Sequence, residues 1–486
     1  MNFRIISKIL SYNLLVLAFS FSGCLLFAVF QQSIKPENLT AWFYCILYSL
    51  IGSVSLQLLG RRAKPTILRK EALAIVGLSW LVCSVVGAVP YHMIAGIGPM
   101  DSFFESASGF TTTGASIFSE IELLPMDLLL WRCLTQWIGG LGMISMFVFI
   151  LSIEGGGSKF LFKGESSLQM RDLGSSNVQV GIRNITITYL VLSMACASCF
   201  YFCGMDLYDS ICHSFATVST GGFSTHSASI GYFNSAPIEW TCVVFMLLGG
   251  TNFVALINLT MYRRSFLSPE TIFYYATFFT ITALILFTMQ SFGKESVSLS
   301  QGFRESAFQV ASLLTSTGFA STDYEKWIPA EHMFLLAAMI MGGCTGSTAG
   351  GLKSIRVLVA FRICLANIER VFRPNIRRSL TIFGKTLSDQ ERDDTLHYVF
   401  LITALCFAAM PILSLMEPLM SEEGVKSAVL ACLFNVGPGF AEVGATDNYG
   451  FLKDTSKLYL SMLMIMGRVE IYAIIVFFIP SFWKKS

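Results

Sequence analysis

Four short segments of the chain combine a stretch long enough for a few helical turns with a following run rich in Gly and small residues. They cover residues 101–116, 209–225, 305–322 and 426–444. Glycine permits positive φ, so the backbone of such a run can turn its carbonyl groups to one side. Several main-chain oxygens facing one axis can replace the hydration shell of a cation. The chemistry open to these residues is therefore coordination of a dehydrated cation by four parts of a single chain.

The first part of each segment reads as a helix too short to cross a bilayer. Asp101, Asp209 and Glu305 stand at the expected start of three of these helices, where a carboxylate suits the helix N-terminus. The opposite end of a helix carries partial negative charge, which favours a cation. We therefore predict half-length helices whose C-terminal ends point toward the bilayer centre.

The four segments align with one another. The third and fourth align without a gap when Ser306 is placed on Ser427, which puts Gly318 on Gly439. The first and second copies contribute Gly114 and Gly221 at the same position. One Gly-rich loop would need no explanation, but four in equivalent places favour a repeated architecture.

The composition identifies a membrane protein. Of the 486 residues, 54% are hydrophobic and 13% are charged, and the mean hydropathy is +0.63. A soluble domain carries about 25% charged residues. No basic patch interleaved with aromatic residues is present, which excludes nucleic acid as a partner. Cys196 and Cys199 form a CxxC within an apolar run, and we interpret them as small buried hydrophobic residues.

We predict an all-α polytopic membrane protein with ten transmembrane helices, each of about 20 mostly apolar residues. The predicted spans are residues 11–31, 38–59, 71–95, 128–152, 184–204, 238–262, 270–292, 331–361, 395–416 and 457–481. The first is interpreted as a retained helix and not as a signal peptide. With both termini in the cytoplasm, most Lys and Arg residues fall on the inside, as the positive-inside rule requires.

The four segments then lie on outward-facing connections, so two leading helices are followed by four helix–pore loop–helix repeats in pseudo-four-fold arrangement. We divide the chain into the leading helices (1–66) and repeats at 67–155, 156–264, 265–365 and 366–486. The inside loops 154–183 and 362–394 are polar enough to meet a cytosolic partner. The Arg-rich part of the second loop is equally compatible with orientation and anionic lipid binding.

The predicted span 331–361 contains a run that should break its helix. The run is small and polar, which favours a flexible intramembrane gate over close helix packing. The predicted gate residues are Gly342, Gly343, Thr345, Gly346, Ser347, Gly350, Gly351, Lys353 and Arg468. Arg468 lies inside an apolar span, so it is a candidate functional residue. It either meets the carbonyls of the glycine run or limits cation access by its charge, and the alternative is a structural ion pair.

Other charged and polar residues have weaker signals. Arg132, near an outer helix end, is interpreted as a snorkelled anchor. Acidic residues on the outer side could concentrate cations at a pore mouth, although a solvated face explains most of them. These acids are Asp101, Glu105, Glu120, Glu122, Asp127, Asp206 and Asp209. His213 and His226 lack metal-ligand spacing.

With these motifs in place, the chain resembles the Trk/Ktr/HKT superfamily of potassium transporters over its whole length. The marks are TTTGAS at 111–116, VSTGGFS at 218–224, TSTGFAS at 315–321 and NVGPGF at 435–440. Further marks are GGCTGSTAGGLKSIR at 342–356 and the lone Arg468. The resemblance implies potassium uptake through a single-chain pore in the bacterial inner membrane. It also implies a homodimer and a cytosolic nucleotide-binding regulatory ring.

The resemblance further implies a potassium ion, transported and bound by carbonyl groups in a selectivity filter. The contact residues are open by one position, most of all in the fourth copy, where Pro438 interrupts the pattern. The candidates are Thr111, Thr112, Thr113, Gly114, Val218, Ser219, Thr220, Gly221, Thr315, Ser316, Thr317, Gly318, Asn435, Val436, Gly437 and Gly439. One central Gly per copy predicts looser rejection of sodium than in potassium channels.

Two other classes of function fit the sequence less well. An alternating-access carrier coupled to sodium or protons also uses broken helices, but usually shows two inverted halves and not four copies of the same sense. Both passive and ion-coupled flux are compatible with the sequence. An intramembrane enzyme would need a nucleophile–base pair or a metal-binding helix, and neither is visible.

Overall fold

The computed structural model describes residues 1–31, 36–63, 67–153, 178–260, 267–293, 298–373, 381–382 and 385–483. In this part of the chain nearly all regular structure is helical. The exception is an antiparallel hairpin of β1 (Thr381–Ile382) and β2 (Lys385–Thr386). The predicted inside loop 154–183 lies mostly outside the described residues.

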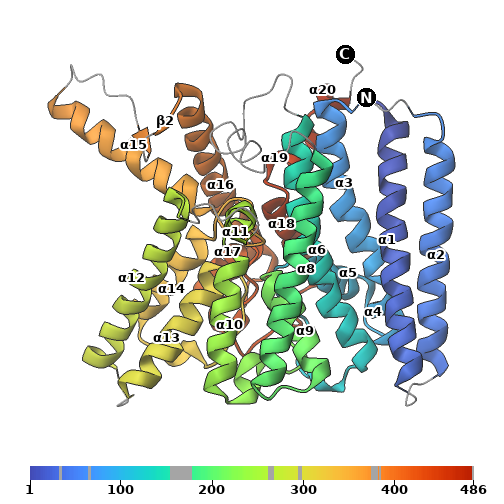
Figure 1. The fold of residues 1–486 in the computed structure, drawn as a ribbon, viewed down its shortest axis with the longest axis horizontal. Coiled ribbons are helices and arrows are strands. Elements are labelled where there is room, and N and C mark those ends of the chain that lie inside the picture. The colour runs from blue at the N-terminus through green and yellow to red at the C-terminus, as the bar shows by residue number, and fades with distance from the viewer. Residues whose placement is uncertain are drawn as a thin grey trace.

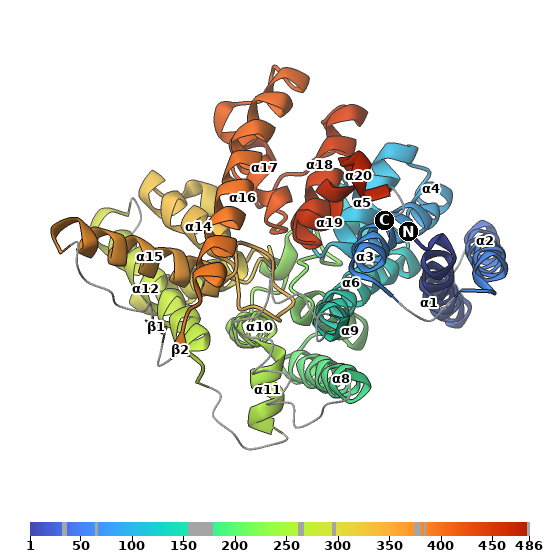
Figure 2. The same cartoon turned by 90° about the horizontal axis from the view of Figure 1, so that it is seen from above.

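Two leading helices, α1 (Phe3–Phe30) and α2 (Pro36–Gly60), pack along each other and stand at one edge of the molecule (Figures 1 and 2). The next elements are α3 (Arg69–Gly87), α4 (Val89–Ile94), α5 (Pro99–Phe110), η1 (Ile121–Leu123), α6 (Met126–Ile153), α8 (Val178–Phe202), α9 (Leu207–Val218), η3 (Ser229–Phe233), α10 (Ala236–Gly249), α11 (Phe253–Thr260), α12 (Pro269–Phe292), α13 (Leu299–Leu314), η4 (Tyr324–Lys326) and α14 (Pro329–Met341). The last are α15 (Ser354–Phe372), α16 (Asp389–Met416), α17 (Glu422–Leu433), η5 (Ala441–Val443), α18 (Asp454–Arg468), α19 (Tyr472–Ile475), η6 (Val476–Phe478) and α20 (Pro480–Trp483).

Six helices among the described residues are long and apolar enough to cross a membrane, or up to eight if each sharply bent pair is one span. The prediction of several membrane-spanning helices is therefore confirmed, while their number, ten, remains a prediction. The beginning of the chain and its last helix meet at one end of the molecule, where the Phe3 and Trp483 rings stack with centroids 6.4 Å apart (Figure 1).

Three predicted spans are not continuous helices. In the span predicted at 238–262, α10 and α11 meet at 102°, and in that at 457–481, α18 and Tyr472–Phe478 meet at 118°. The second bend follows from Glu470 and Ile471, whose φ values are 58° and 35°. The span predicted at 331–361 is interrupted between α14 and α15, in the Gly-rich run that was expected to break it.

Four half-length helices, α5, α9, α13 and α17, precede the four Gly-containing runs, as predicted. Their starts differ from the prediction. Asp206, not Asp209, caps α9 by accepting from the Asp209 amide, and α13 begins at Leu299, well before Glu305. Ser298 caps that helix by accepting from the Gln301 amide. A hydroxyl serves this role as well as a carboxylate because both accept a hydrogen bond from the first turn.

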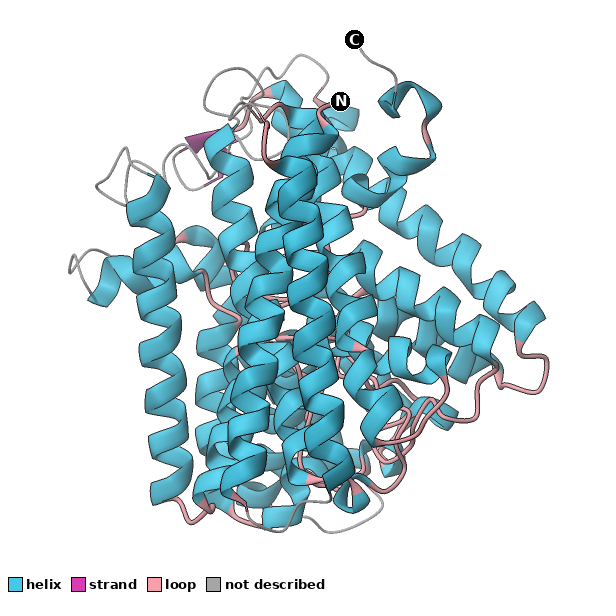
Figure 3. Cartoon of the chain, turned by 90° about the vertical axis from the view of Figure 1, so that its right-hand side faces the viewer, coloured by secondary structure: helices cyan, strands magenta, loops and turns pink. Residues whose placement is uncertain are grey.

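The half-helices and their Gly-containing runs are mostly buried. Figure 3 shows loop segments behind the long helices that face the viewer. Non-helical backbone at such depth is tolerable only where protein buries it or where it lines a wet cavity. One large apolar core extends from α5 to α18, and a second joins the leading helices to α6 through aromatic residues such as Phe21, Trp42 and Trp131. These cores hold the half-helices in place.

Candidate functional site

All four half-helices end in the same backbone geometry. The second residue after each helix has positive φ, which is uncommon for a residue with a side chain. These residues are Thr112 at 52°, Thr220 at 53°, Ser316 at 56° and Asn435 at 56°. Two residues later comes a glycine, also with positive φ: Gly114 at 86°, Gly222 at 81°, Gly318 at 79° and Gly437 at 95°. We call the four stretches 111–114, 219–222, 315–318 and 434–437 the turn segments.

Each of these glycines faces a main-chain carbonyl of the next copy. A Cβ atom added to Gly114 would lie 2.2 Å from the Gly221 oxygen. The corresponding distance is 1.9 Å from Gly222 to the Thr317 oxygen and 2.1 Å from Gly318 to the Val436 oxygen. From Gly437 to the Thr113 oxygen it is 2.5 Å, which returns to the first copy. The four turn segments therefore follow one another in closed cyclic order.

This geometry corrects the alignment of the copies. Gly318 is matched by Gly437 and not by Gly439, and Gly114 is matched by Gly222 and not by Gly221. Letter identity misled the alignment because the second and fourth copies each contain two nearby glycines. Positive φ distinguishes the structurally equivalent one. Fourteen of the sixteen candidate residues lie in the turn segments, Val218 directly precedes the second, and Gly439 lies two residues beyond the fourth.

Side-chain hydrogen bonds stabilise the turn segments. The hydroxyls of Thr111 and Thr113 are 2.7 Å apart, and those of Thr315 and Thr317 are also 2.7 Å apart. In the fourth copy, the amide of Asn435 takes over this role and donates to the Thr113 hydroxyl at 2.9 Å. The fourth copy has Asn435 where the other copies have Thr or Ser, and this residue links the fourth copy to the first.

A pocket lies directly beyond the turn segments. It is lined by one glycine from each copy, Gly114, Gly222, Gly318 and Gly437, and by residues that follow them. All four copies therefore meet at one cavity, as a shared central passage requires.

The Gly-rich run between α14 and α15 packs against the C-terminal ends of three half-helices. The Thr348 hydroxyl donates to the Val218 oxygen at 3.0 Å, and the Gly351 amide donates to the Phe434 oxygen at 3.0 Å. The Gly350 amide donates to the Ser316 hydroxyl. These contacts place the run on the side of the turn segments opposite the pocket.

Arg468 contacts a carbonyl of this run, which is one of the alternatives predicted from the sequence. Its Nη1 donates to the Thr348 carbonyl at 2.6 Å, and the residue is buried. Lys353 donates to the Ala349 carbonyl of the same run. Two cationic side chains thus hold carbonyl groups of the run, and a small cavity lined by both lies beside it.

Glu470 does not pair with Arg468. This agrees with its position two residues further along the chain, which would place it on another face of a helix. It pairs with Arg356 at 2.6 Å, and the Arg356 guanidinium lies 4.0 Å from the centre of the Tyr398 ring. Sequence reasoning missed this contact because the bend after α18 determines where Glu470 points.

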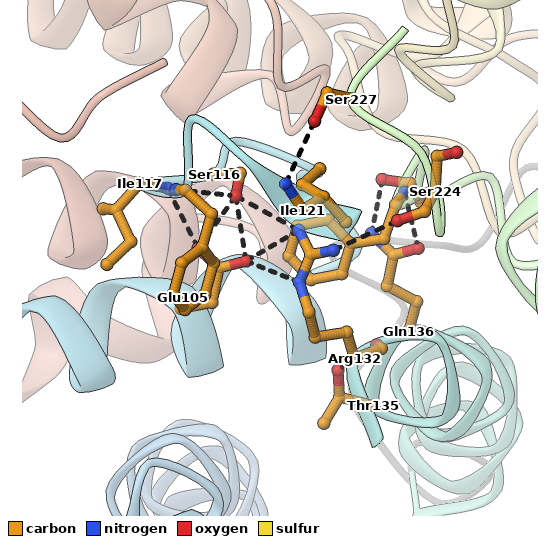
Figure 4. Close-up of polar contacts among 12 residues, drawn as sticks. Glu105, Ser116, Ile117, Ile121, Arg132, Thr135, Gln136, Ser224 and Ser227 are labelled. Carbon is orange, nitrogen blue, oxygen red and sulfur yellow. Dashed lines mark hydrogen bonds and ion pairs between the residues drawn. The ribbon is translucent and has the colours of Figure 1, made fainter. Parts of the chain in front are cut away.

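The interpretation of Arg132 as a snorkelled anchor is wrong. Arg132 is 1% exposed and pairs with Glu105 at 2.9 Å (Figure 4). Two more of the acids that the sequence predicted on the outer side are also engaged: Asp101 pairs with Lys457 at 2.5 Å, and Asp209 lies 3.0 Å from His226. These contacts leave less free negative charge on these acids than the sequence indicated.

The described residues contain no group of three or more His, Cys, Asp or Glu side chains that could hold a metal ion. His213 is hydrogen-bonded on both ring nitrogens, to the Asp209 oxygen at 2.8 Å and to the Ser224 hydroxyl at 3.0 Å.

One acid on the connection between α13 and α14 gives a pH-dependent prediction. Burial, followed by the negative charges of Asp447 and Asp323, raises the pKa of Glu325 to about 7. A carboxyl with a raised pKa in the folded state stabilises that state at low pH, and this contribution is lost as the pH rises from about 4.5 to about 7. We expect Glu325→Gln to flatten the decline of the thermal unfolding midpoint between pH 5 and 8, measured in detergent. Parallel pH profiles for the two proteins would contradict this expectation.

Comparison with known proteins gives consistent matches along the chain. A family model described as "TrkH: Cation transport protein" matches residues 42–270 and 261–485. The chain is 33% identical over 496 residues to the Trk system potassium uptake protein TrkH of Escherichia coli K12, with 100% of both chains covered. It is 34% identical over 425 residues to TrkG of the same organism, with 86% of each covered. The crystal structure of the potassium transporter TrkH from Vibrio parahaemolyticus matches with a TM-score of 0.90 at 28% identity, covering 100% of both chains.

Proposed function

Because this chain belongs to the TrkH family of cation transport proteins, we propose that its four turn segments form a selectivity filter through which potassium enters the cell. The chain is a membrane subunit of a Trk potassium uptake system in the inner membrane, and it is not an enzyme. The pore, the filter and the gate described below are our proposal.

One observation supports the proposed filter. Each of the four glycines faces a carbonyl of the next copy, and the four contacts form a closed cycle. The facing carbonyls belong to Thr113, Gly221, Thr317 and Val436. Four oxygens around one axis replace part of the hydration shell of a potassium ion. The half-helices add partial negative charge below them, since the C-terminal end of each one leads directly into a turn segment.

The experiment that tests this function is rubidium uptake into proteoliposomes with competing sodium and an imposed proton gradient. A pore predicts rubidium flux that persists without a proton or sodium gradient and that sodium inhibits weakly. Flux that requires either gradient would favour the alternating-access carrier.

The Gly-rich run between α14 and α15 forms the gate in this proposal. It lies against the inner ends of three half-helices, so it stands in the path of an ion that has passed the filter. Arg468 holds the run through the Thr348 carbonyl and places a positive charge beside the path. A buried cation near the path repels a potassium ion strongly because the surroundings have a low dielectric constant.

The gate predicts the effect of truncating Arg468. We expect Arg468→Ala to raise rubidium flux by at least about threefold, which corresponds to ~0.7 kcal/mol in the barrier. Arg356→Ala is the matched control, since it removes a nearby cation whose side chain pairs with Glu470 and not with a carbonyl of the run. Equal flux in wild type and Arg468→Ala would show that the arginine has a purely structural role.

The remaining parts of the proposal concern assembly. We propose a homodimer that binds a TrkA-like nucleotide-binding ring on the cytoplasmic side, with both termini on that side. The division into leading helices and four repeats at 67–155, 156–264, 265–365 and 366–486 accounts for the four half-helices. Helix α15 projects from one side of the molecule (Figure 1) and carries exposed apolar residues such as Phe361 and Ile368, which suits contact with lipid or a second copy.

A further inference from the structure

The buried ion pair of Glu105 and Arg132 lies beside the ends of two turn segments, and Arg132 lines the pocket beyond them. Glu105 is 0% exposed and Arg132 is 1% exposed. Burying two charges has a desolvation cost that their attraction offsets only when further hydrogen bonds satisfy both groups, and removing one partner leaves an uncompensated buried charge.

The guanidinium of Arg132 joins three partners (Figure 4). Its Nε donates to Glu105 Oε1 at 2.9 Å, its Nη2 donates to the Ser116 hydroxyl at 3.1 Å, and its Nη1 donates to the Ser224 carbonyl at 3.1 Å. Glu105 Oε2 in turn accepts from the Ile117 amide at 3.0 Å. All three guanidinium nitrogens are therefore engaged.

These partners occupy equivalent positions in neighbouring copies. Ser116 lies two residues beyond Gly114, and Ser224 lies two residues beyond Gly222. Arg132 thus spans from the end of the first turn segment to the end of the second. A guanidinium is planar and presents its donors in a fixed fork, so it sets the separation of its acceptors.

The same helix holds the second turn segment at another point. Gln136 lies one turn after Arg132 on α6, and its Nε2 donates to the Gly221 carbonyl at 2.6 Å. Its Oε1 accepts from the Phe223 amide at 3.0 Å. Since Gly221 supplies one of the four facing carbonyls, α6 determines both where this carbonyl lies and how far it is from the first copy.

This charged contact occurs in one copy of the four. Glu105 is the fifth residue before the end of its half-helix. The corresponding residues of the other copies are His213, Gln309 and Ala428. The junction of the first and second copies is therefore held differently from the other three.

We propose that Glu105 and Arg132 are positioning residues that set the spacing of the first two turn segments and thereby the preference of the pore for potassium over sodium. This inference rests on the proposed function of the turn segments as a filter. Carbonyl groups that are held apart cannot close around the smaller sodium ion, so rigid spacing favours the larger ion.

The test measures the rubidium-to-sodium permeability ratio in proteoliposomes. Arg132→Lys keeps the charge but offers one ammonium group in place of a fork, and Glu105→Gln keeps the shape but removes the negative charge. We expect each variant to lower the ratio by at least about threefold. A merely structural role would reduce the amount of functional protein, which lowers both fluxes equally and leaves their ratio unchanged.

The matched control is the ion pair of Glu239 and Arg304, which joins α10 to α13 at 3.0 Å and whose side chains form no hydrogen bond with a turn segment among the described residues. Glu239→Gln and Arg304→Lys should leave the ratio as in wild type. Equal changes in both pairs would overturn the proposal, since the effect would then not depend on contact with the turn segments.

Two further variants keep the test decisive. Ser116→Ala retains both charges and removes the hydroxyl that accepts from Arg132, so it covers the case in which a charge variant fails to reach the membrane. We expect a smaller fall of the ratio in the same direction, and an unchanged ratio would overturn the proposal. Gly318→Ser tests the filter itself: if it changes the ratio while the Glu105, Arg132 and Ser116 variants do not, the pair is only structural and the filter stands.

Discussion

Gly318→Ser is expected to impair potassium selectivity or conduction. We expect the rubidium-to-sodium ratio or the rubidium flux to fall by at least about tenfold, which is equivalent to ~1.4 kcal/mol. Gly318 has φ of 79°, and an added Cβ would lie 2.1 Å from the Val436 oxygen. The side chain must therefore displace a carbonyl that faces the proposed path. Flux and competition by sodium in proteoliposomes measure the effect.

The control for Gly318→Ser is Gly96→Ser. Gly96 also has positive φ, at 66°, but an added Cβ would meet nothing within 4 Å. This variant shares the backbone strain of a left-handed conformation and lacks the clash with a carbonyl. If both variants reduced selectivity equally, general destabilisation would explain the result. If Gly318→Ser retained the potassium preference of wild type, its turn segment would not be part of a filter.

Deletion of residues 345–351 is expected to produce a leaky pore, with rubidium flux raised by at least about tenfold, or ~1.4 kcal/mol off the barrier. The deletion removes the contacts of the run with Val218, Ser316 and Phe434 and the carbonyl that Arg468 holds. The chain can close over the gap because the Leu352 amide already donates to the Ile340 carbonyl at 3.0 Å.

The rubidium-to-sodium ratio distinguishes an open gate from a damaged pore. The turn segments are also held by contacts that the deletion leaves in place, such as the hydrogen bond from Gln136 to Gly221. We therefore expect the ratio to stay within about twofold of wild type while flux rises. Unchanged rubidium flux in a properly inserted protein would contradict the proposal that the run is a gate.

Much of this architecture could be predicted from the sequence because local properties determine it. Long apolar runs predicted the membrane helices, and four short helix-forming stretches before Gly-containing runs predicted the half-helices. The small, polar composition of the run at 342–353 predicted its break. The apolar surroundings of Arg468 predicted that it would face protein or water, and its guanidinium contacts the Thr348 carbonyl.

Other features depend on contacts between distant parts of the chain, which periodicity does not report. The register of the copies, with Gly222 and Gly437 in place of Gly221 and Gly439, depends on where each half-helix ends against its neighbours. The pairing of Arg132 with Glu105 depends on how α6 packs between two copies.

The sequence by itself therefore determined that four like segments dip among apolar helices, since helix length, glycine and hydropathy are properties of contiguous residues. Only the tertiary structure decided which carbonyl faces which glycine and which buried charges meet, because these relations arise when residues far apart in the chain pack within a few ångströms of one another.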